Sequence, residues 1–172
     1  MANNFRQRLK QGTVAGAIMA ATLTGFEGVR LKAYPDPATG GKPWTICMGD
    51  TNGVKRGDIA TLAECKQQLY DLAPKYIKPL EACLKVPVPD KRLIALTSLA
   101  WNLGPGVVCG SSKKNRLPSV AELLNAGKVA KACDAFLRYS YAAGIYFPGL
   151  HTRRVKERAM CLEPIGPKNP VE

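Results

Sequence analysis

The chain has 172 residues, 46% of them hydrophobic, which is enough for one domain, or a domain of two lobes, with a buried core. It carries 25 Lys and Arg against 13 Asp and Glu. The net charge of +12 favours polyanionic partners such as nucleic acid, anionic lipid or cell-wall polymer. A single histidine, His151, and the lack of any CxxC pair argue against a zinc site.

The first 26 residues have the organisation of an export signal. Arg6, Arg8 and Lys10 form a basic start, and residues 11–26 carry no charge. This run is rich in Ala, Gly and Thr, and as a helix it would span ~24 Å, short of the ~30 Å hydrocarbon core, which disfavours a permanent anchor. Three interpretations remain: a signal peptide cleaved near Ala21, a plain buried helix, or a segment that inserts uncut and later leaves the membrane. We favour the last.

The next stretch predicts a helix followed by a small sheet. Residues 22–33 are expected to be helical, with apolar contacts from Phe26 and Leu31. Proline and glycine then punctuate the chain, and the alternating stretch WTICMG predicts a hairpin or small sheet over residues 34–51. A loop is expected over residues 52–58.

Helices dominate the rest of the chain. Thr61 and Glu64 form a capping box that opens a helix to about Leu84, bent at Pro74 and Pro79. The further expected elements are an apolar helix capped by Asp90 and ended by Gly104, a helix opened by a Ser119–Glu122 capping box, helices over 128–140 and 149–162, and a loose tail over 164–172. The pattern predicts an α+β protein with a small β lobe and a larger helical part.

Six cysteines follow the N-terminal segment, at positions 47, 65, 83, 109, 133 and 161. Their even number and wide spacing suit disulfides formed in an oxidising compartment, while reduced core cysteines are the alternative. Six cysteines allow 15 pairings, which the sequence does not resolve.

Two carboxylates could support glycoside hydrolysis, which needs an acid on one side of the sugar and a second carboxylate on the other. Glu27 lies among apolar residues, where partial burial would raise its proton affinity, as a general acid requires. Asp36 lies in a turn-rich stretch that would keep it ionised, and the Thr45 hydroxyl could hold a water molecule. The alternative is that Glu27 pairs with Arg30 and Asp36 only shapes a turn.

Three motifs strengthen the catalytic interpretation. The pattern E-G-x-R-L-K-x-Y-x-D over residues 27–36, followed by W-T-I-x-x-G over 44–49, resembles the active-site helix and hairpin of phage lysozymes of the T4 and lambdoid endolysin type, glycoside hydrolase family 24. The stretch TSLAWNLGPG (97–106) resembles the helix end that lines the saccharide cleft in that family. GLHTRRVKERAMCL (149–162) resembles the final helix of the family, and the likeness covers roughly residues 22–163.

The resemblance implies a lysozyme-like fold and a role for each matched residue. Glu27 would be the general acid, Asp36 would position or activate the attacking water, and Thr45 would hold that water. The family inverts the anomeric centre, which needs carboxyls ~6.5–9.5 Å apart. Trp101 and Asn102 would face the substrate cleft, although Trp101 could simply belong to the core.

Two positions do not follow the family pattern. Many relatives have a histidine where Asp50 stands, which puts a local ion pair of the β lobe in doubt. His151 matches no family site and is expected to be a helix-surface residue.

The N-terminus also resembles the signal-anchor-release segments of some endolysins, which are exported by the host secretion machinery and held inactive on the inner membrane until its potential collapses. Because Glu27 directly follows the apolar run, inserting the run should pull Glu27 out of its cleft. This segment has no cysteine, which excludes thiol exchange with it. Cys47, near Thr45, could form a regulatory bridge, although we favour a structural one.

The sequence therefore predicts an exported muramidase, a lysozyme that cuts the β-1,4 bond between N-acetylmuramic acid and N-acetylglucosamine in peptidoglycan during host lysis. We expect it to be a monomer that is tethered to the inner membrane and then released into the periplasm, with no cofactor, no metal and no specific nucleic-acid partner. The alternatives are a cationic module that binds nucleic acid or membrane, and a related glycosidase acting on chitin.

The expected division of the chain is a signal-anchor-release segment (1–25), an active-site helix with a β lobe (26–60), a helical lobe (61–163) and a tail (164–172). Pairing the cysteines in the order of the expected elements gives Cys47–Cys65, Cys83–Cys109 and Cys133–Cys161.

Overall fold

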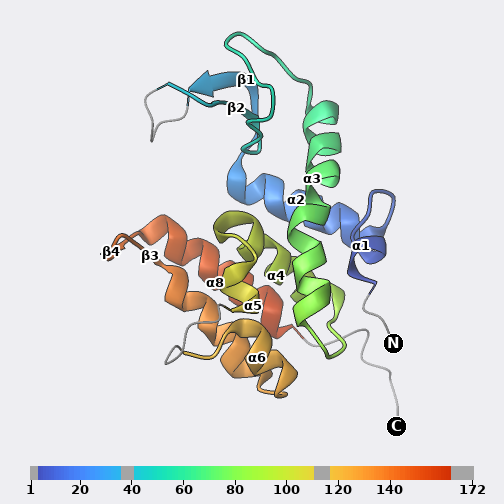
Figure 1. Cartoon of the computed structure of the whole chain (residues 1–172), viewed down its shortest axis with the longest axis vertical. Helices are drawn as coiled ribbons and strands as arrows, with labels where there is room; N and C mark the ends of the chain where they lie inside the picture. The colour runs from blue at the N-terminus through green and yellow to red at the C-terminus, as the bar shows by residue number, and fades with distance from the viewer. Residues whose placement is uncertain (1–3, 36–40, 111–116, 164–172) are drawn as a thin grey trace.

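The computed structural model describes residues 4–35, 41–110 and 117–163, and Figure 1 shows their arrangement. A two-stranded antiparallel sheet lies at one end of the molecule, and a long helix, α3, runs from that end into a group of helices. In chain order the elements are α1 (Phe5–Arg8), α2 (Val14–Glu27), β1 (Arg30–Pro35), β2 (Trp44–Cys47), α3 (Leu62–Cys83), α4 (Asp90–Leu103), α5 (Gly106–Cys109), α6 (Val120–Asn125), α7 (Val129–Asp134), a 3₁₀ helix (Ala135–Tyr139), β3 (Tyr141–Ala142), β4 (Ile145–Tyr146) and α8 (Pro148–Leu162). The predicted α+β class is confirmed.

The β lobe contains the predicted hairpin, but its first strand, β1, begins at Arg30 rather than at residue 34. Tyr34 of β1 lies opposite Thr45 of β2, and Pro35 lies opposite Trp44. A later segment adds to the other edge of β1, because the Ala60 backbone N–H donates to the Leu31 carbonyl at 2.8 Å. This second contact ties the loop after β2 onto the sheet.

The helix predicted over residues 22–33 is wrong in its second half. Helix α2 ends at Glu27, and Gly28 takes a positive φ of 70°, a conformation that glycine adopts without a steric penalty. The chain then enters β1, where Leu31 is exposed rather than packed in an apolar contact. The glycine after the helix, and not the apolar spacing, decides where α2 stops.

Helix α3 joins the two lobes. Its predicted capping box is confirmed, since the Thr61 side chain accepts from the Glu64 N–H and the Glu64 side chain accepts from the Thr61 N–H. Pro74 and Pro79 lie inside the helix.

Helix α4 is the centre of the helical lobe. Leu93, Ile94, Leu96 and Leu99 are all fully buried, so this helix is enclosed by its neighbours rather than packed on one side. The prediction that Asp90 caps α4 is wrong: Pro89 is the N-cap residue, and Asp90 lies in the first turn and pairs with Arg8. This pairing joins the N-terminal segment to α4.

The N-terminal segment packs as helices against the body of the protein. Phe5, Leu9, Met19 and Leu23 are fully buried or nearly so. Thr13 caps α2 by accepting from the Gly16 N–H at 2.9 Å. Among the residues that the structure describes, no helix has both the length and the apolar character needed to cross a membrane.

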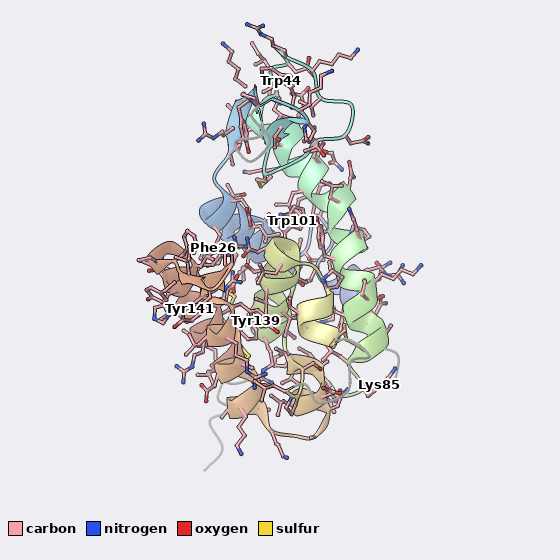
Figure 2. The ribbon with its side chains drawn as sticks, turned by 60° about the vertical axis from the view of Figure 1, so that its left-hand side comes forward. Phe26, Trp44, Lys85, Trp101, Tyr139 and Tyr141 are labelled. Atoms are coloured by element: carbon pink, nitrogen blue, oxygen red, sulfur yellow. A yellow bond between two sulfur atoms is a disulfide. The ribbon has the colours of Figure 1, made fainter. Side chains whose placement is uncertain are left out.

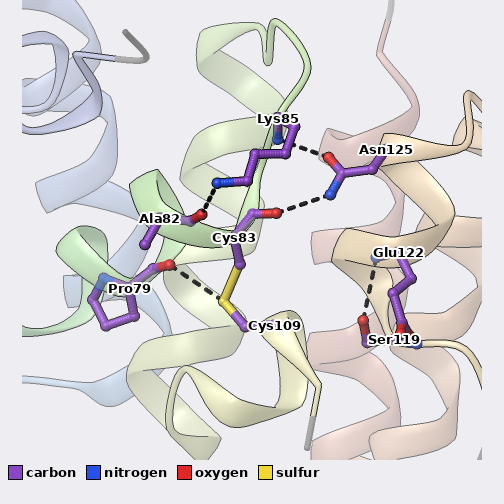
Figure 3. The surroundings of a disulfide bond; sticks show 8 residues. All are labelled: Pro79, Ala82, Cys83, Lys85, Cys109, Ser119, Glu122 and Asn125. Atoms are coloured by element: carbon purple, nitrogen blue, oxygen red, sulfur yellow. Dashed lines mark hydrogen bonds between the residues drawn. A yellow bond between two sulfur atoms is a disulfide. The ribbon is translucent and has the colours of Figure 1, made fainter.

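Three disulfides join the elements, and the suggested pairing is confirmed. Cys47–Cys65 links β2 to α3, Cys83–Cys109 links α3 to α5, and Cys133–Cys161 links α7 to α8. Figure 3 shows the second bridge, beside which the Asn125 side chain donates to the Cys83 carbonyl and accepts from the Lys85 N–H, both at 2.8 Å. The amide of Asn125 thus holds the end of α6 against the end of α3.

The C-terminal elements follow the prediction with two changes. The Ser119–Glu122 capping box opens α6, and the helix expected over 149–162 is α8. The helix expected over 128–140 becomes α7 followed by a 3₁₀ helix, and the hairpin β3–β4 leads into α8. The tail at 164–172 lies outside the described residues.

Candidate active site

Glu27 is the last residue of α2, at the point where Gly28 turns the chain toward the β lobe. Its side chain is 23% exposed, and its Oε1 atom lies 2.6 Å from Nη1 of Arg153 in α8. The alternative pairing of Glu27 with Arg30 is not seen, since the Arg30 guanidinium lies over the Tyr34 ring. Glu27 is thus a partly accessible carboxyl held by the final helix.

Arg153 is fixed by several neighbours at once. Its Nε donates to Oε1 of Glu157 at 3.0 Å, and its Nη2 donates to the carbonyl and hydroxyl oxygens of Ser98 at 3.3 Å. Its guanidinium lies 4.9 Å from the centre of the Phe26 ring, which Figure 2 shows at the end of α2 beside α8. The contacts from α2, α4 and α8 leave Arg153 little freedom, so its position fixes that of Glu27.

Glu157 and Arg154 form the buried part of this network. Both side chains are fully buried, with Nε of Arg154 2.8 Å from Oε2 of Glu157. The Ser98 hydroxyl donates to Oε1 of Glu157 at 2.6 Å. Burial raises the pKa of Glu157, an effect that Arg154 and Ser98 partly offset, and burial lowers the pKa of Arg154. This buried pair therefore holds Arg153 from the interior of the protein rather than from its surface.

Thr45 lies on β2 and is 8% exposed. Two residues further along, Cys47 is bound to Cys65 of α3, so a covalent bond holds the end of this strand against the helix that joins the lobes. Asp36, the expected partner of Glu27, lies outside the described residues.

The two expected cleft residues are at the end of α4. The Trp101 ring is 4.6 Å from the Tyr76 ring and packs beside the Cys47–Cys65 bridge. Oδ1 of Asn102 accepts from Nη2 of Arg154 at 3.1 Å, which joins Asn102 to the buried network. Both residues are partly buried, and their contact with substrate stays a prediction.

A groove lies beside the Glu27–Arg153 pair. It has a volume of about 600 Å³ and runs between the end of α2 and the start of α8. Phe26 and Phe147 form apolar walls, and Arg153 and Lys156 are its charged lining residues. Glu27 itself does not line the groove, which adjoins the site through Phe26 and through Arg153, the ion-pair partner of Glu27.

Asp50 and His151 have local partners. Oδ1 of Asp50 accepts from the Asn52 N–H at 3.0 Å, and His151 is a partly exposed residue of α8 whose Nδ1 is 3.2 Å from the Ser140 hydroxyl. Within the described residues, no group of three or more His, Cys, Asp and Glu side chains is placed to hold a metal ion.

The sequence interpretation missed Arg153, Glu157 and Ser98. Arg153 and Glu157 belong to the R-R-x-x-E part of the final-helix motif, and their spacing of four residues places them on one face of a helix. That spacing was a usable signal for an ion pair, whereas nothing near Ser98 in the sequence indicates that it meets α8.

The arrangement of the two lobes, with an accessible carboxyl between them held by an arginine of the last helix, defines a lysozyme-like protein. Residues 24–157 match the model of the phage lysozyme family. The chain is 31% identical to the SAR-endolysin of Enterobacteria phage P21, covering 94% of this chain and 98% of the relative. It is 34% identical to the SAR-endolysin of Bacteriophage PS119, covering 94% and 96%.

A solved structure shows the same architecture. The active form of the P1 phage endolysin Lyz superposes with a TM-score of 0.72 at 25% identity, covering 87% of this chain and 84% of that one. The chain belongs to the phage lysozyme family. It is a glycoside hydrolase of the endolysin class that acts on peptidoglycan in host lysis.

Proposed function

We propose that this endolysin cuts the β-1,4 bond between N-acetylmuramic acid and N-acetylglucosamine, with inversion at the anomeric carbon. Glu27 protonates the leaving oxygen, Asp36 activates a water molecule on the opposite side of the sugar, and Thr45 holds that water. The observation that carries this proposal is the Glu27 carboxyl, 23% exposed at the end of α2 and 2.6 Å from Arg153.

The Glu27–Arg153 ion pair helps this reaction by fixing the orientation of the general acid. A general acid must lie within hydrogen-bond reach of the oxygen that it protonates, so a carboxyl at the end of a helix needs a fixed orientation. Arg153 supplies that orientation through Nη1, while its other nitrogens bind Glu157 and Ser98. The exposed part of the Glu27 side chain remains available to substrate.

The test is the Glu27→Gln variant, which keeps the size of the side chain and removes the transferable proton. We expect the rate of clearing of purified sacculi to fall by at least about 10²–10⁴-fold, with an unchanged circular dichroism spectrum. A cationic binding module would keep its effect on cells in this variant. Faster cleavage of chitin oligomers than of peptidoglycan would instead favour the chitinase alternative.

We also propose that the protein is exported and tethered to the inner membrane before it acts, as the names of the P21 and PS119 relatives indicate for those proteins. In the folded state α2 buries Met19 and Leu23 in the core and carries Glu27 at its end. Drawing this segment into the bilayer would separate Glu27 from Arg153, so the tethered protein would be inactive.

Fractionation of cells tests the tether. The full-length chain should sediment with membranes in energised cells and move to the periplasm as a monomer after addition of an uncoupler. A chain shortened near Ala21, or one that never sediments with membranes, would contradict this part of the proposal.

A further inference from the structure

The β lobe carries a second concave site, away from Glu27. It has a volume of about 720 Å³ and is lined by Lys42, Pro43, Trp44, Val54, Lys55 and Arg56. Trp44 precedes Thr45 on the same strand, and consecutive strand residues point to opposite faces of a sheet. The Trp44 site is therefore on the face of the hairpin opposite to the one that Thr45 occupies.

The walls of this site are held in place by the fold. Trp44 and Val54 pack against the hydrophobic core, which leaves only part of each side chain exposed. The turn that carries Lys55 and Arg56 is closed by Asp58, whose Oδ2 accepts from the Lys55 N–H at 2.8 Å. The backbone of Asp58 in turn accepts from the Ala33 N–H at 2.9 Å, which ties the turn to β1. Trp44, Val54 and the backbone of the Lys55 turn are therefore held by the fold.

The charge of this site favours an anion. Lys55 and Arg56 are exposed, and neither forms a salt bridge within the part of the chain that the structure describes. No lining residue is acidic, and the Asp58 carboxylate is engaged by the Lys55 backbone N–H. In Figure 2, Trp44 is at the top of the molecule, where side chains with nitrogen at their ends project outward. An arginine beside a lysine suits a carboxylate that accepts from both.

We propose that the Trp44 site, defined by the six residues named above, binds a carboxylate-bearing strand of peptidoglycan next to the strand being cut. A sugar ring or peptide stem would lie against the Trp44 ring, and a stem-peptide carboxylate would accept from Lys55 and Arg56. The polymer is the substrate of the proposed function, on which this inference rests, and it is dense in carboxylates. The site would hold the enzyme on the wall between cleavage events.

The experiment measures binding and cleavage separately. Binding of Glu27→Gln protein to purified sacculi is measured by sedimentation, with and without the added pair Lys55→Gln and Arg56→Gln. The matched control removes the same charge from the helical lobe with Lys128→Gln and Lys131→Gln, which line another depression. Sacculi whose carboxylates have been converted to amides form a second arm.

We expect the double substitution Lys55→Gln/Arg56→Gln to weaken binding to native sacculi about tenfold at low salt. The control substitutions should weaken it by less than about twofold. On amidated sacculi the difference between the two pairs should disappear. Equal losses for the two pairs would overturn the proposal, as would a difference that persists on amidated sacculi. It would also fail if the Lys55/Arg56 pair weakened binding only to vesicles with phosphorylated glycolipid, or only to duplex DNA.

A soluble hexasaccharide of alternating N-acetylglucosamine and N-acetylmuramic acid separates this inference from the proposed function. The chain with an intact Glu27 should cut it, and the Lys55/Arg56 pair should change that rate by less than about twofold. Failure of the intact enzyme to cut the hexasaccharide would sink the muramidase assignment. If the intact enzyme cuts the hexasaccharide but the Lys55/Arg56 and control double variants bind sacculi equally, only the proposal for the Trp44 site is contradicted.

Discussion

Replacing Arg153 by lysine tests whether the buried network positions Glu27. The guanidinium contacts Glu27 at 2.6 Å, Glu157 at 3.0 Å and Ser98 at 3.3 Å through different nitrogens. A lysine keeps the charge but has a single nitrogen, so it cannot occupy all of these positions.

The expected loss follows from the hydrogen bonds that disappear. Losing one hydrogen bond to a charged group costs about 1.5–3 kcal/mol, which for a chain of this size lowers Tm by about 3–12 °C. A displaced Glu27 should lower kcat on sacculi by about 10–100-fold with little change in KM, because the acid and not the binding surface is moved.

Thermal unfolding followed by circular dichroism and a turbidity assay on sacculi measure both effects. The control is Arg158→Lys on the same helix, whose partner Asp134 is 2.6 Å away with both side chains more than a third exposed. This exposed pair should contribute less than about 1 kcal/mol. The reasoning is refuted if the two variants have the same Tm, or if Arg153→Lys keeps the wild-type kcat.

Three further outcomes are expected. Replacing the Cys47–Cys65 bridge by serines should lower the free energy of unfolding by about 3 kcal/mol. It should also lower activity more than loss of the distant Cys133–Cys161 bridge, because Cys47 lies close to Thr45 on β2. Equal activity losses would speak against this. Leu23→Ala should lower the free energy of unfolding by about 2–5 kcal/mol, whereas Val14→Ala, at an exposed position of the same helix, should change it by less than about 0.5 kcal/mol in urea titrations. Burial raises the pKa of Tyr139, an effect that Arg138 partly offsets, and the Tyr139 hydroxyl donates to the Val107 carbonyl. The neutral phenol therefore contributes stability in full below the pKa of the unfolded chain, about 10. This contribution is lost as the pH rises through the higher pKa of the folded protein. The stability difference between wild type and Tyr139→Phe should therefore narrow above pH ~10, and a constant difference would contradict the assignment.

Short-range patterns gave reliable predictions in this chain. The Thr61–Glu64 and Ser119–Glu122 capping boxes, the hairpin of β1 and β2, and the buried α4 each depend on residues within a few positions of one another. The misplaced end of α2 had a local signal too, because Gly28 stands where the helix stops. Apolar spacing outweighed that glycine in the prediction.

The N-terminal segment shows where a local pattern leaves two states open. Its uncharged, Ala-rich run suits a membrane or a protein core about equally well, since both replace water by apolar surroundings. In the folded state Leu23 and Met19 are buried in the core, and their helix α2 packs against α3 and α4. Nothing in the run itself selects that arrangement, because the partners come from later in the chain.

From the sequence alone, the capping boxes, a hairpin after an apolar helix, and a carboxyl in the stretch between them could be predicted, because caps, alternation and helical periodicity act over a few residues; the exact end of that helix at Glu27 was not predicted. The contact of Glu27 with Arg153, and the contacts of Arg153 with Glu157 and Ser98, could be seen only in the folded protein. An ion pair between α2 and α8 depends on the packing of both helices around α4, and that packing is a property of the whole core.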